Sequence, residues 1–205
     1  MSQRSRTPQG LRERTRRAVR KEITEAAGRL FVERGYEATT VDDIAAEVGM
    51  SARSVFRYFP TKEDLVVGKF DFIAEDVLDA LRERPAGEPV WESLRRSFDL
   101  LVPHVDAPGE RGVAEPIQEI VFATPGLLAS YLAKLNMIQD VAEEAIRQRA
   151  EDAGSPYAAA DPTPRALVGA ACGCLVAAQK AWLAGGAQQT FAETLDGAMS
   201  TIRPS

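Results

Sequence analysis

Residues 39–65 read TTVDDIAAEVGMSARSVFRYFPTKEDL, a stretch with the signals for two short helices, a tight turn between them and the start of a third helix. Thr40 and Asp43 have the capping-box spacing, in which a hydroxyl caps the first helix and a carboxylate three residues later reaches back to the cap. Gly49 ends this helix, because glycine adopts the left-handed turn conformation without steric cost. Ser51 is placed to cap the second helix. The pattern predicts a helix-turn-helix, whose second helix enters the major groove of DNA.

The second helix of this stretch presents polar and aromatic side chains outward. Val55 and Phe59 lie four residues apart on the side expected to be buried, and Pro60 ends the helix. Thr61 and Asp64 repeat the capping-box spacing and open the next helix. Lys62 falls in the first turn of that helix, beside N–H groups that favour an anion such as a phosphate. An ordinary corner between two helices has the same turn geometry, so the turn by itself leaves both interpretations open. The residues that we expect to contact DNA are Thr39, Thr40, Ser51, Ala52, Arg53, Ser54, Phe56, Arg57, Tyr58 and Lys62.

The whole stretch resembles the N-terminal domain of the tetracycline-repressor (TetR) family. In that family a TT-x-x-x-IA-x-x-x-G-x-S segment leads into an aromatic-rich recognition helix and an F-P-x-K-E-x-L end, and the match here has no gaps. Phe56 departs from it, since the family usually has a tyrosine there that touches the DNA backbone. We expect the phenylalanine ring to pack on a thymine methyl or a deoxyribose. The resemblance implies a homodimeric repressor that binds a palindromic operator and is released by a small molecule, with an activator of the same fold as the alternative.

The charge of the chain is divided between its two parts. Residues 1–60 contain 12 Lys and Arg against 8 Asp and Glu, whereas residues 61–205 contain 13 against 22. The two parts therefore have different partners, and the basic part suits the phosphates of double-stranded DNA. A solvated tail with no partner is the alternative for the first 21 residues. Their basic residues, against Glu13 alone, are Arg4, Arg6, Arg12, Arg14, Arg16, Arg17, Arg20 and Lys21.

Apolar residues recur at helical spacing along the chain, and no stretch alternates with period two. We therefore predict an all-α protein of about nine helices. The first helix runs over 11–34 and is closed by Gly35. The fourth is expected to run unbroken over 62–83, and the resemblance implicates it in carrying a ligand signal to the DNA. The expected domains are a basic arm with the DNA-binding helices over 1–61, and a ligand-binding and dimerisation domain over 62–205.

Proline residues set the expected limits of the middle helices. One helix over about 91–102 should stop near Pro103 and His104, and a loop is expected over 105–112. Pro116 removes a helical hydrogen bond, so the segment up to residue 122 is expected to form a short or broken helix.

Two long helices are expected to begin with Thr-Pro, at 124–125 and 163–164, with threonine as the cap and proline in the first helical position. The helix over 163–184 has small residues on several faces, which allows neighbouring backbones to approach closely. It is either an interior helix of one chain or part of a dimer interface. The resemblance implies the second arrangement, a homodimer through helices eight and nine, over 163–184 and 191–202. The small residues are Ala166, Gly169, Ala170, Ala171, Gly173, Ala177 and Ala178.

Candidates for a small-molecule site are aromatic, soft apolar and polar residues on helices of the second domain. Most residues of these kinds on such helices simply belong to the hydrophobic core, which is the alternative for each of them. The resemblance implies a ligand cavity enclosed by helices four to eight but names no effector. The apolar stripes favour a lipophilic or mostly neutral effector, such as an acyl derivative or an antibiotic-like compound. Gln118 and Asn136 are further possible polar anchors. The candidates are Phe70, Ile73, Trp91, Phe98, His104, Phe122, Tyr131, Met137, Gln179 and Trp182.

No catalytic, cofactor or metal motif accompanies these features. The sequence has one His, no Cys/His metal spacing, no Gly-rich phosphate loop and no G-x-S-x-G, which argues against an enzyme. Cys172 and Cys174 are two apart on a helix and are expected to be small core residues. A helical enzyme for an apolar substrate and a DNA-architectural protein without ligand are the rival classes. With no signal-peptide stretch and no uncharged run long enough to span a bilayer, we expect a cytoplasmic protein without a membrane partner.

Overall fold

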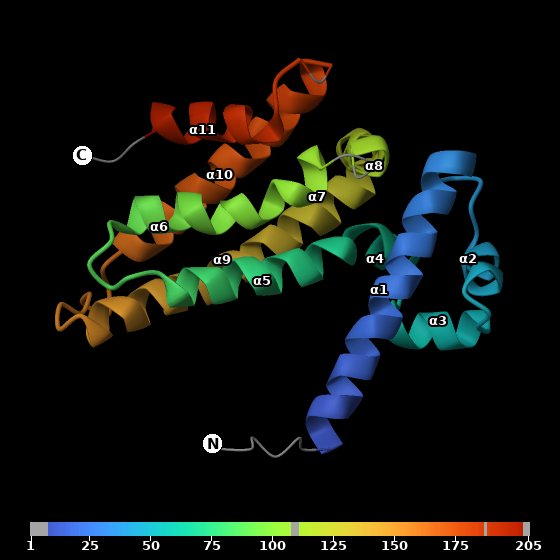
Figure 1. The fold of residues 1–205 in the computed structure, drawn as a ribbon, viewed down its shortest axis with the longest axis horizontal. Coiled ribbons are helices and arrows are strands. Elements are labelled where there is room, and N and C mark those ends of the chain that lie inside the picture. The colour runs from blue at the N-terminus through green and yellow to red at the C-terminus, as the bar shows by residue number, and fades with distance from the viewer. Residues whose placement is uncertain (1–7, 108–110, 187, 203–205) are drawn as a thin grey trace. The chain divides into compact units, whose positions relative to one another are not determined.

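The computed structural model describes residues 8–107, 111–186 and 188–202, and Figure 1 shows that the regular structure in them is helical. These residues form eleven α-helices and one short 3-10 helix, so the predicted all-α class is confirmed. The chain divides into two compact units, Met1–Lys69 and Phe70–Ser205.

The first unit contains α1 (Pro8–Arg34), α2 (Val41–Glu47), α3 (Ala52–Tyr58) and α4 (Lys62–Val67). The apolar stripe of α1 packs against α2 and α4, and Gly35 ends the helix with a φ of 84°. The core residues of this unit, each at most 3% exposed, are Ile23, Ala26, Ala27, Leu30, Phe31, Ile44, Ala45, Val55, Phe59, Leu65, Val66 and Val67.

Both expected capping boxes are present in the first unit. The hydroxyl of Thr40 accepts the N–H of Asp43 at 3.1 Å, and the N–H of Thr40 donates to the Asp43 carboxylate at 2.8 Å. Thr61 and Asp64 make the same two bonds, each at 3.1 Å. Between α2 and α3, Gly49 has a φ of 65°, as the predicted turn requires. The sequence therefore predicted the turns of this unit residue by residue.

The prediction of one unbroken helix over 62–83 was wrong. The chain forms α4 and then, after Gly68, a separate α5 (Lys69–Glu83). Gly68 is needed because of close approach: a Cβ atom there would lie 2.6 Å from the carbonyl oxygen of Asp64 and 2.6 Å from the ring of Phe59. The apolar periodicity continues across the break, so it gave no sign of it.

The second unit contains α5, α6 (Val90–Ser97), the 3-10 helix η1 (Phe98–Leu101), α7 (Pro103–Asp106), α8 (Arg111–Ala123), α9 (Pro125–Asp152), α10 (Thr163–Ala184) and α11 (Phe191–Thr201). Helix α10 packs on α9 and α11 and also contacts α6 and α8, so it is the central helix of the unit. Its residues Val168, Ala171 and Trp182 are at most 2% exposed.

Three local expectations for the second unit need correction. Pro103 begins α7 instead of ending the helix before it, which shortens the expected loop over 105–112. Pro116 lies inside an α8 of 13 residues, and the carbonyl that it leaves without a helical donor belongs to Gly112 in the first turn. The N-cap of α10 is Pro162, not Thr163, and the Asp161 carboxylate accepts the N–H of Thr163 at 2.9 Å.

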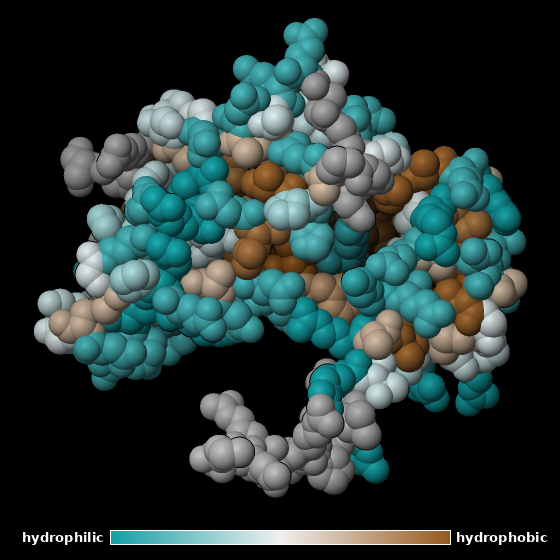
Figure 2. Space-filling view, in the orientation of Figure 1, coloured by the Kyte–Doolittle hydropathy of each residue, from teal (hydrophilic) through white to brown (hydrophobic). Residues whose placement is uncertain are grey.

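Among the described residues, α10 is long and apolar enough to span a membrane by length and composition, and α8 with α9, bent by 103°, would pass the same test together. The inner face of α10 is occupied by its contacts with α9 and α11, as in a core helix. Figure 2 shows hydrophobic residues gathered near the centre of the visible face of the second unit, with hydrophilic residues along its margins.

Candidate nucleic-acid interface and ligand site

The outer face of α3 carries the candidate DNA contacts. The Ser51 hydroxyl caps the helix by accepting the N–H of Ser54 at 3.2 Å. Val55, 0% exposed, anchors the opposite face in the core, while Arg53 and Arg57 are exposed and Phe56 is 46% exposed. The helix therefore presents two guanidinium groups and one aromatic ring to solvent from a rigid support.

The remaining candidates of this helix lie around that face. Ser51 is exposed, and Ala52, Ser54 and Tyr58 are half-buried. The guanidinium carbon of Arg57 lies 5.6 Å from the centre of the Tyr58 ring, which restricts the arginine side chain.

Lys62 is held by an aromatic ring of the same unit. Its Nζ lies 4.2 Å from the centre of the Tyr36 ring, and the Tyr36 hydroxyl donates to Glu63 at 3.1 Å. Burial, together with the Glu63 carboxylate, raises the pKa of Tyr36 above its usual value, so the hydroxyl remains a donor at neutral pH. The phosphate contact of Lys62 stays a prediction.

Two of the expected DNA contacts belong to the scaffold. Thr39 is 0% exposed, and its hydroxyl donates to the carbonyl oxygens of Gly35 at 2.9 Å and Leu30 at 3.2 Å. The prediction that the Thr39 side chain contacts DNA is therefore wrong; it fastens the start of α2 to the end of α1. Thr40 is exposed, but its hydroxyl already serves the capping box with Asp43.

The N-terminal helix extends the basic surface of the first unit. The exposed basic residues in the first half of α1 are Arg12, Arg14, Arg16, Arg17 and Lys21. The guanidinium carbon of Arg20 lies 5.1 Å from the centre of the Phe59 ring, so this arginine packs on the unit. Arg4 and Arg6 of the expected arm lie outside the described residues.

In the second unit, four of the predicted ligand-site residues come together from four helices. The ring of Tyr131 on α9 lies 5.0 Å from that of Phe70 on α5 and 6.1 Å from that of Phe122 on α8. The Tyr131 hydroxyl donates to the side-chain oxygen of Gln179 on α10 at 2.8 Å. Burial raises the pKa of Tyr131, so the hydroxyl is neutral. We call Phe70, Phe122, Tyr131 and Gln179 the aromatic cluster.

A polar group and a cation adjoin the aromatic cluster. Gln118, 5% exposed, lies one helical turn before Phe122 on α8, and its side-chain oxygen has no donor within the described part of the chain. The Nζ of Lys180 lies 5.6 Å from the centre of the Phe122 ring. Buried polar atoms normally have partners, so Gln118 is a ready acceptor for a ligand hydroxyl or amide.

The other candidates are dispersed. Met137 is 68% exposed, so its assignment to a cavity was wrong. It follows the buried Leu135 by two residues, a rotation of about 200° around the helix, and therefore points to the opposite side. Trp91 lines a surface groove of about 340 Å³ between α6 and α11. The rest are core or half-buried positions, Ile73, Phe98, His104 and Trp182.

Cys172 and Cys174 are buried free thiols, as expected, and burial raises the pKa of Cys172 to about 11. In the part of the chain that the structure describes, no group of three or more His, Cys, Asp or Glu side chains is placed to hold a metal ion. The burial of Arg149 was not predicted, because an arginine in a helix, with Arg147 and Glu151 two residues to either side, suggests a surface residue.

A small helix-turn-helix unit followed by a larger helical unit defines a helix-turn-helix transcription regulator. Residues 23–67 match the family profile described as bacterial regulatory proteins, tetR family, and residues 88–205 match the profile described as MftR C-terminal domain. The second match covers more than half of the chain. The chain therefore belongs to the TetR family, whose members are transcription regulators. The predicted family is confirmed.

Known relatives support the same assignment. The chain is 36% identical over 129 residues to the HTH-type transcriptional regulator TcmR of Streptomyces glaucescens, covering 61% of this chain and 57% of TcmR. It spans 57%, 31% and 47% of the first three curated relatives. The structure of FadR from Bacillus subtilis in complex with stearoyl-CoA is similar with a TM-score of 0.58 at 17% identity, over 88% of this chain and 95% of that chain.

A second solved structure, the SmeT–triclosan complex, has a TM-score of 0.59 at 18% identity, over 90% of this chain and 91% of that chain. SmeT is the repressor of the Stenotrophomonas maltophilia multidrug efflux pump SmeDEF. At these identities, FadR and SmeT show that the fold is shared.

Proposed function

We propose that the protein is a ligand-responsive repressor that binds a palindromic operator as a homodimer and is released by a small lipophilic effector. The observation that carries the proposal is the outer face of α3, where exposed Arg53, Phe56 and Arg57 stand on a helix anchored by buried Val55. Arginine pairs with guanine in the major groove, and an apolar ring suits the thymine methyl. We assign the chain no enzymatic role and expect it to act in the cytoplasm, where its DNA lies.

The dimer that we propose uses the outer faces of α10 and α11. Ala171 and Ala178 of α10 are 0% and 1% exposed within a single chain, so these two small residues serve the core of the unit. Ala166, Gly173 and Ala177 are exposed along the opposite side of the same helix. The small residues on this outer side allow close approach of a two-fold related copy, and the exposed Lys180 of the same side places its Nζ 5.6 Å from the centre of the Phe122 ring. Such a pair would present two α3 helices to half-sites about 34–36 Å apart.

The effector site that we propose is the aromatic cluster. FadR of Bacillus subtilis was solved with stearoyl-CoA and SmeT with triclosan, and both ligands have large apolar parts. In this chain, the Phe70 ring contacts Tyr131, and Asp71 pairs with Lys134 of α9 at 2.5 Å. These two contacts fasten the first turn of α5 to α9. An effector that displaces Tyr131 would therefore shift the first turn of α5, which follows α4 in the chain directly after Gly68.

The DNA assignment is tested by Arg53→Ala. Operator affinity should fall by about 1–3 kcal/mol, and discrimination at one base pair per half-site should relax, because the guanidinium reads a base edge. The measurement is a titration against DNA upstream of the chain's own gene, at several salt concentrations. Arg82→Ala is the control, since Arg82 is exposed in the second unit and pairs with Asp79 at 2.7 Å. Equal operator binding by Arg53→Ala and wild type would refute the assignment.

The effector assignment is tested with stearoyl-CoA and triclosan as probes. At least one should weaken operator binding by about 5- to 150-fold, the usual range for coupled sites. Phe122→Ala should lose about 1.5–3 kcal/mol of probe affinity, because it removes a ring from the aromatic cluster. Met137→Ala, at a position 68% exposed, should respond like wild type. A probe that binds without changing operator affinity, or that binds Phe122→Ala as tightly as wild type, would refute this site.

A further inference from the structure

Arg149, near the end of α9, is a buried arginine with unused hydrogen-bond donors. It is 8% exposed. Its Nη2 donates to the carbonyl oxygen of Pro85 at 2.8 Å and to the Ser93 hydroxyl oxygen at 3.0 Å. Its Nε and Nη1 are buried and have no acceptor among the residues that the structure describes. Three of the five N–H bonds of this guanidinium therefore have no partner in that part of the chain.

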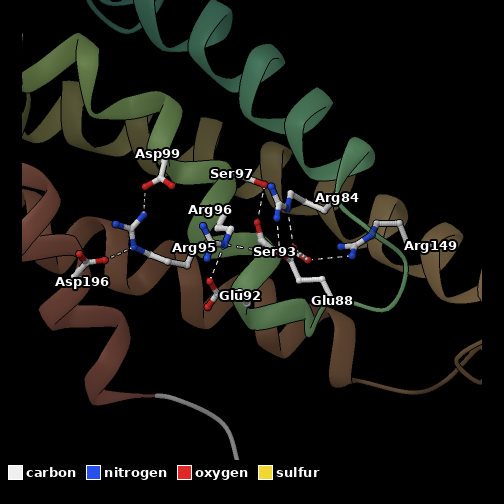
Figure 3. A network of polar contacts seen from close by, with 10 residues as sticks. All are labelled: Arg84, Glu88, Glu92, Ser93, Arg95, Arg96, Ser97, Asp99, Arg149 and Asp196. Atoms are coloured by element: carbon white, nitrogen blue, oxygen red, sulfur yellow. Dashed lines mark hydrogen bonds and ion pairs between the residues drawn. The ribbon is translucent and has the colours of Figure 1, made fainter.

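The nearest carboxylate in this network, that of Glu88, is already engaged, as Figure 3 shows. One of its oxygens accepts from Arg84 Nε and from the Ser93 hydroxyl, each at 2.7 Å. The other accepts from Arg84 Nη2 and has Arg96 at 3.8 Å. The hydrogen bonds from Arg84 and Ser93 lower the pKa of Glu88 to about 2, so it is fully ionised at neutral pH.

The cluster has more positive than negative charge. Arg84 pairs with Glu88, and Arg96 pairs with Glu92 at 2.8 Å, so Arg149 has no ion pair of its own among the described residues and only the longer-range attraction of Glu88, which Arg84 opposes. A buried cation without an adjacent counter-ion is unfavourable, and burial accordingly lowers the pKa of Arg149. A water molecule would satisfy the N–H groups but would add no negative charge.

We propose that Nε and Nη1 of Arg149 bind an oxyanion, the carboxylate or phosphate group of a ligand, beneath the connection between α5 and α6. Arginine binds both groups well, because its donors match their oxygens. Access requires movement of the exposed Pro85–Gly87 segment, which Arg149 itself ties to α9 through the bond to Pro85.

The experiment is a thermal unfolding titration of the full chain with inorganic phosphate, without DNA, at an ionic strength held constant with sodium chloride. The unfolding midpoint of wild type should rise saturably, by about 3–6 °C at ten times the Kd. Arg149→Met should show no saturable rise, and without phosphate it should be at least as stable as wild type, since it removes an unpaired buried charge. Arg82→Met, which loses an exposed arginine, should respond like wild type.

A second variant and two further probes complete the test. Arg149→Lys keeps the charge but loses the planar group, so it should bind phosphate more weakly than wild type even if Arg149→Met does not fold. Acetate and octanoate distinguish the source of the anion: equal, Arg149-dependent affinities indicate a free small anion, and tighter octanoate binding indicates the head group of an apolar ligand.

Two results would overturn the proposal. One is a wild-type midpoint that does not respond to phosphate, acetate or octanoate. The other is an equal response in wild type, Arg149→Met and Arg149→Lys. Neither result bears on operator binding, so failure of this proposal is distinguishable from failure of the DNA-binding function.

Discussion

A charge on the outer face of α10 should abolish tight operator binding. Ala177 is exposed within one chain, so Ala177→Glu leaves the fold of the single chain intact and places an unpaired carboxylate in the proposed interface. Loss of the dimer turns one bivalent contact with DNA into two separate half-site contacts. Operator affinity should therefore fall by about 100- to 10,000-fold.

Sedimentation and operator titration at the same protein concentration check this prediction. Ala160→Glu is the control, because Ala160 is exposed in the connection between α9 and α10 and lies outside the proposed interface. It should remain dimeric and bind the operator like wild type. An Ala177→Glu protein that sediments as a dimer and binds with wild-type affinity would exclude this face as the interface.

Phe59→Ala should unfold the DNA-binding unit. Phe59 is 1% exposed. Its ring packs closely against Gly68, and the Arg20 guanidinium lies over the ring. Removal of a buried phenylalanine ring costs about 3–5 kcal/mol, a large share of the stability of so small a unit. Chemical unfolding should show a first transition at lower denaturant concentration, with the transition of the second unit unchanged.

The neighbouring Phe56 provides the matched control for that prediction. It lies three residues earlier, is 46% exposed, and should change stability by about 0.5 kcal/mol or less when replaced by alanine. Operator affinity of Phe56→Ala should nevertheless fall, because we propose that the exposed side of α3, to which the ring belongs, faces the DNA. Equal stability losses in the two variants would show that α3 is buried differently from the structure described above.

Local sequence signals predicted the DNA-binding unit well because its turns depend on residues close together in the chain. The capping boxes at Thr40 and Thr61 and the left-handed Gly49 are examples. The burial of Thr39 was not predicted, because it depends on hydrogen bonds from the Thr39 hydroxyl to carbonyl groups at the end of α1. The need for glycine at position 68, where the helix breaks, comes from the nearby ring of Phe59, nine residues earlier in the chain. The periodicity of apolar residues contains no information about such a contact.

The proposed ligand site was harder to predict because its members come from four helices. Composition suggested Phe70, Phe122, Tyr131 and Gln179, which do meet. Composition equally suggested Met137, because the sequence does not show whether a methionine on a long helix faces the interior or the solvent. Only the packing of α9 on its neighbours separates the two outcomes.

The two free thiols of α10 give the protein a built-in probe of its own motions. Cys172 and Cys174 are buried, and the Cys172 pKa of about 11 leaves little thiolate at neutral pH. Alkylation of these two thiols in the native protein therefore requires that α10 opens first. Because α10 is the central helix of its unit, the labelling rate measures the opening of the whole unit, without any engineered cysteine.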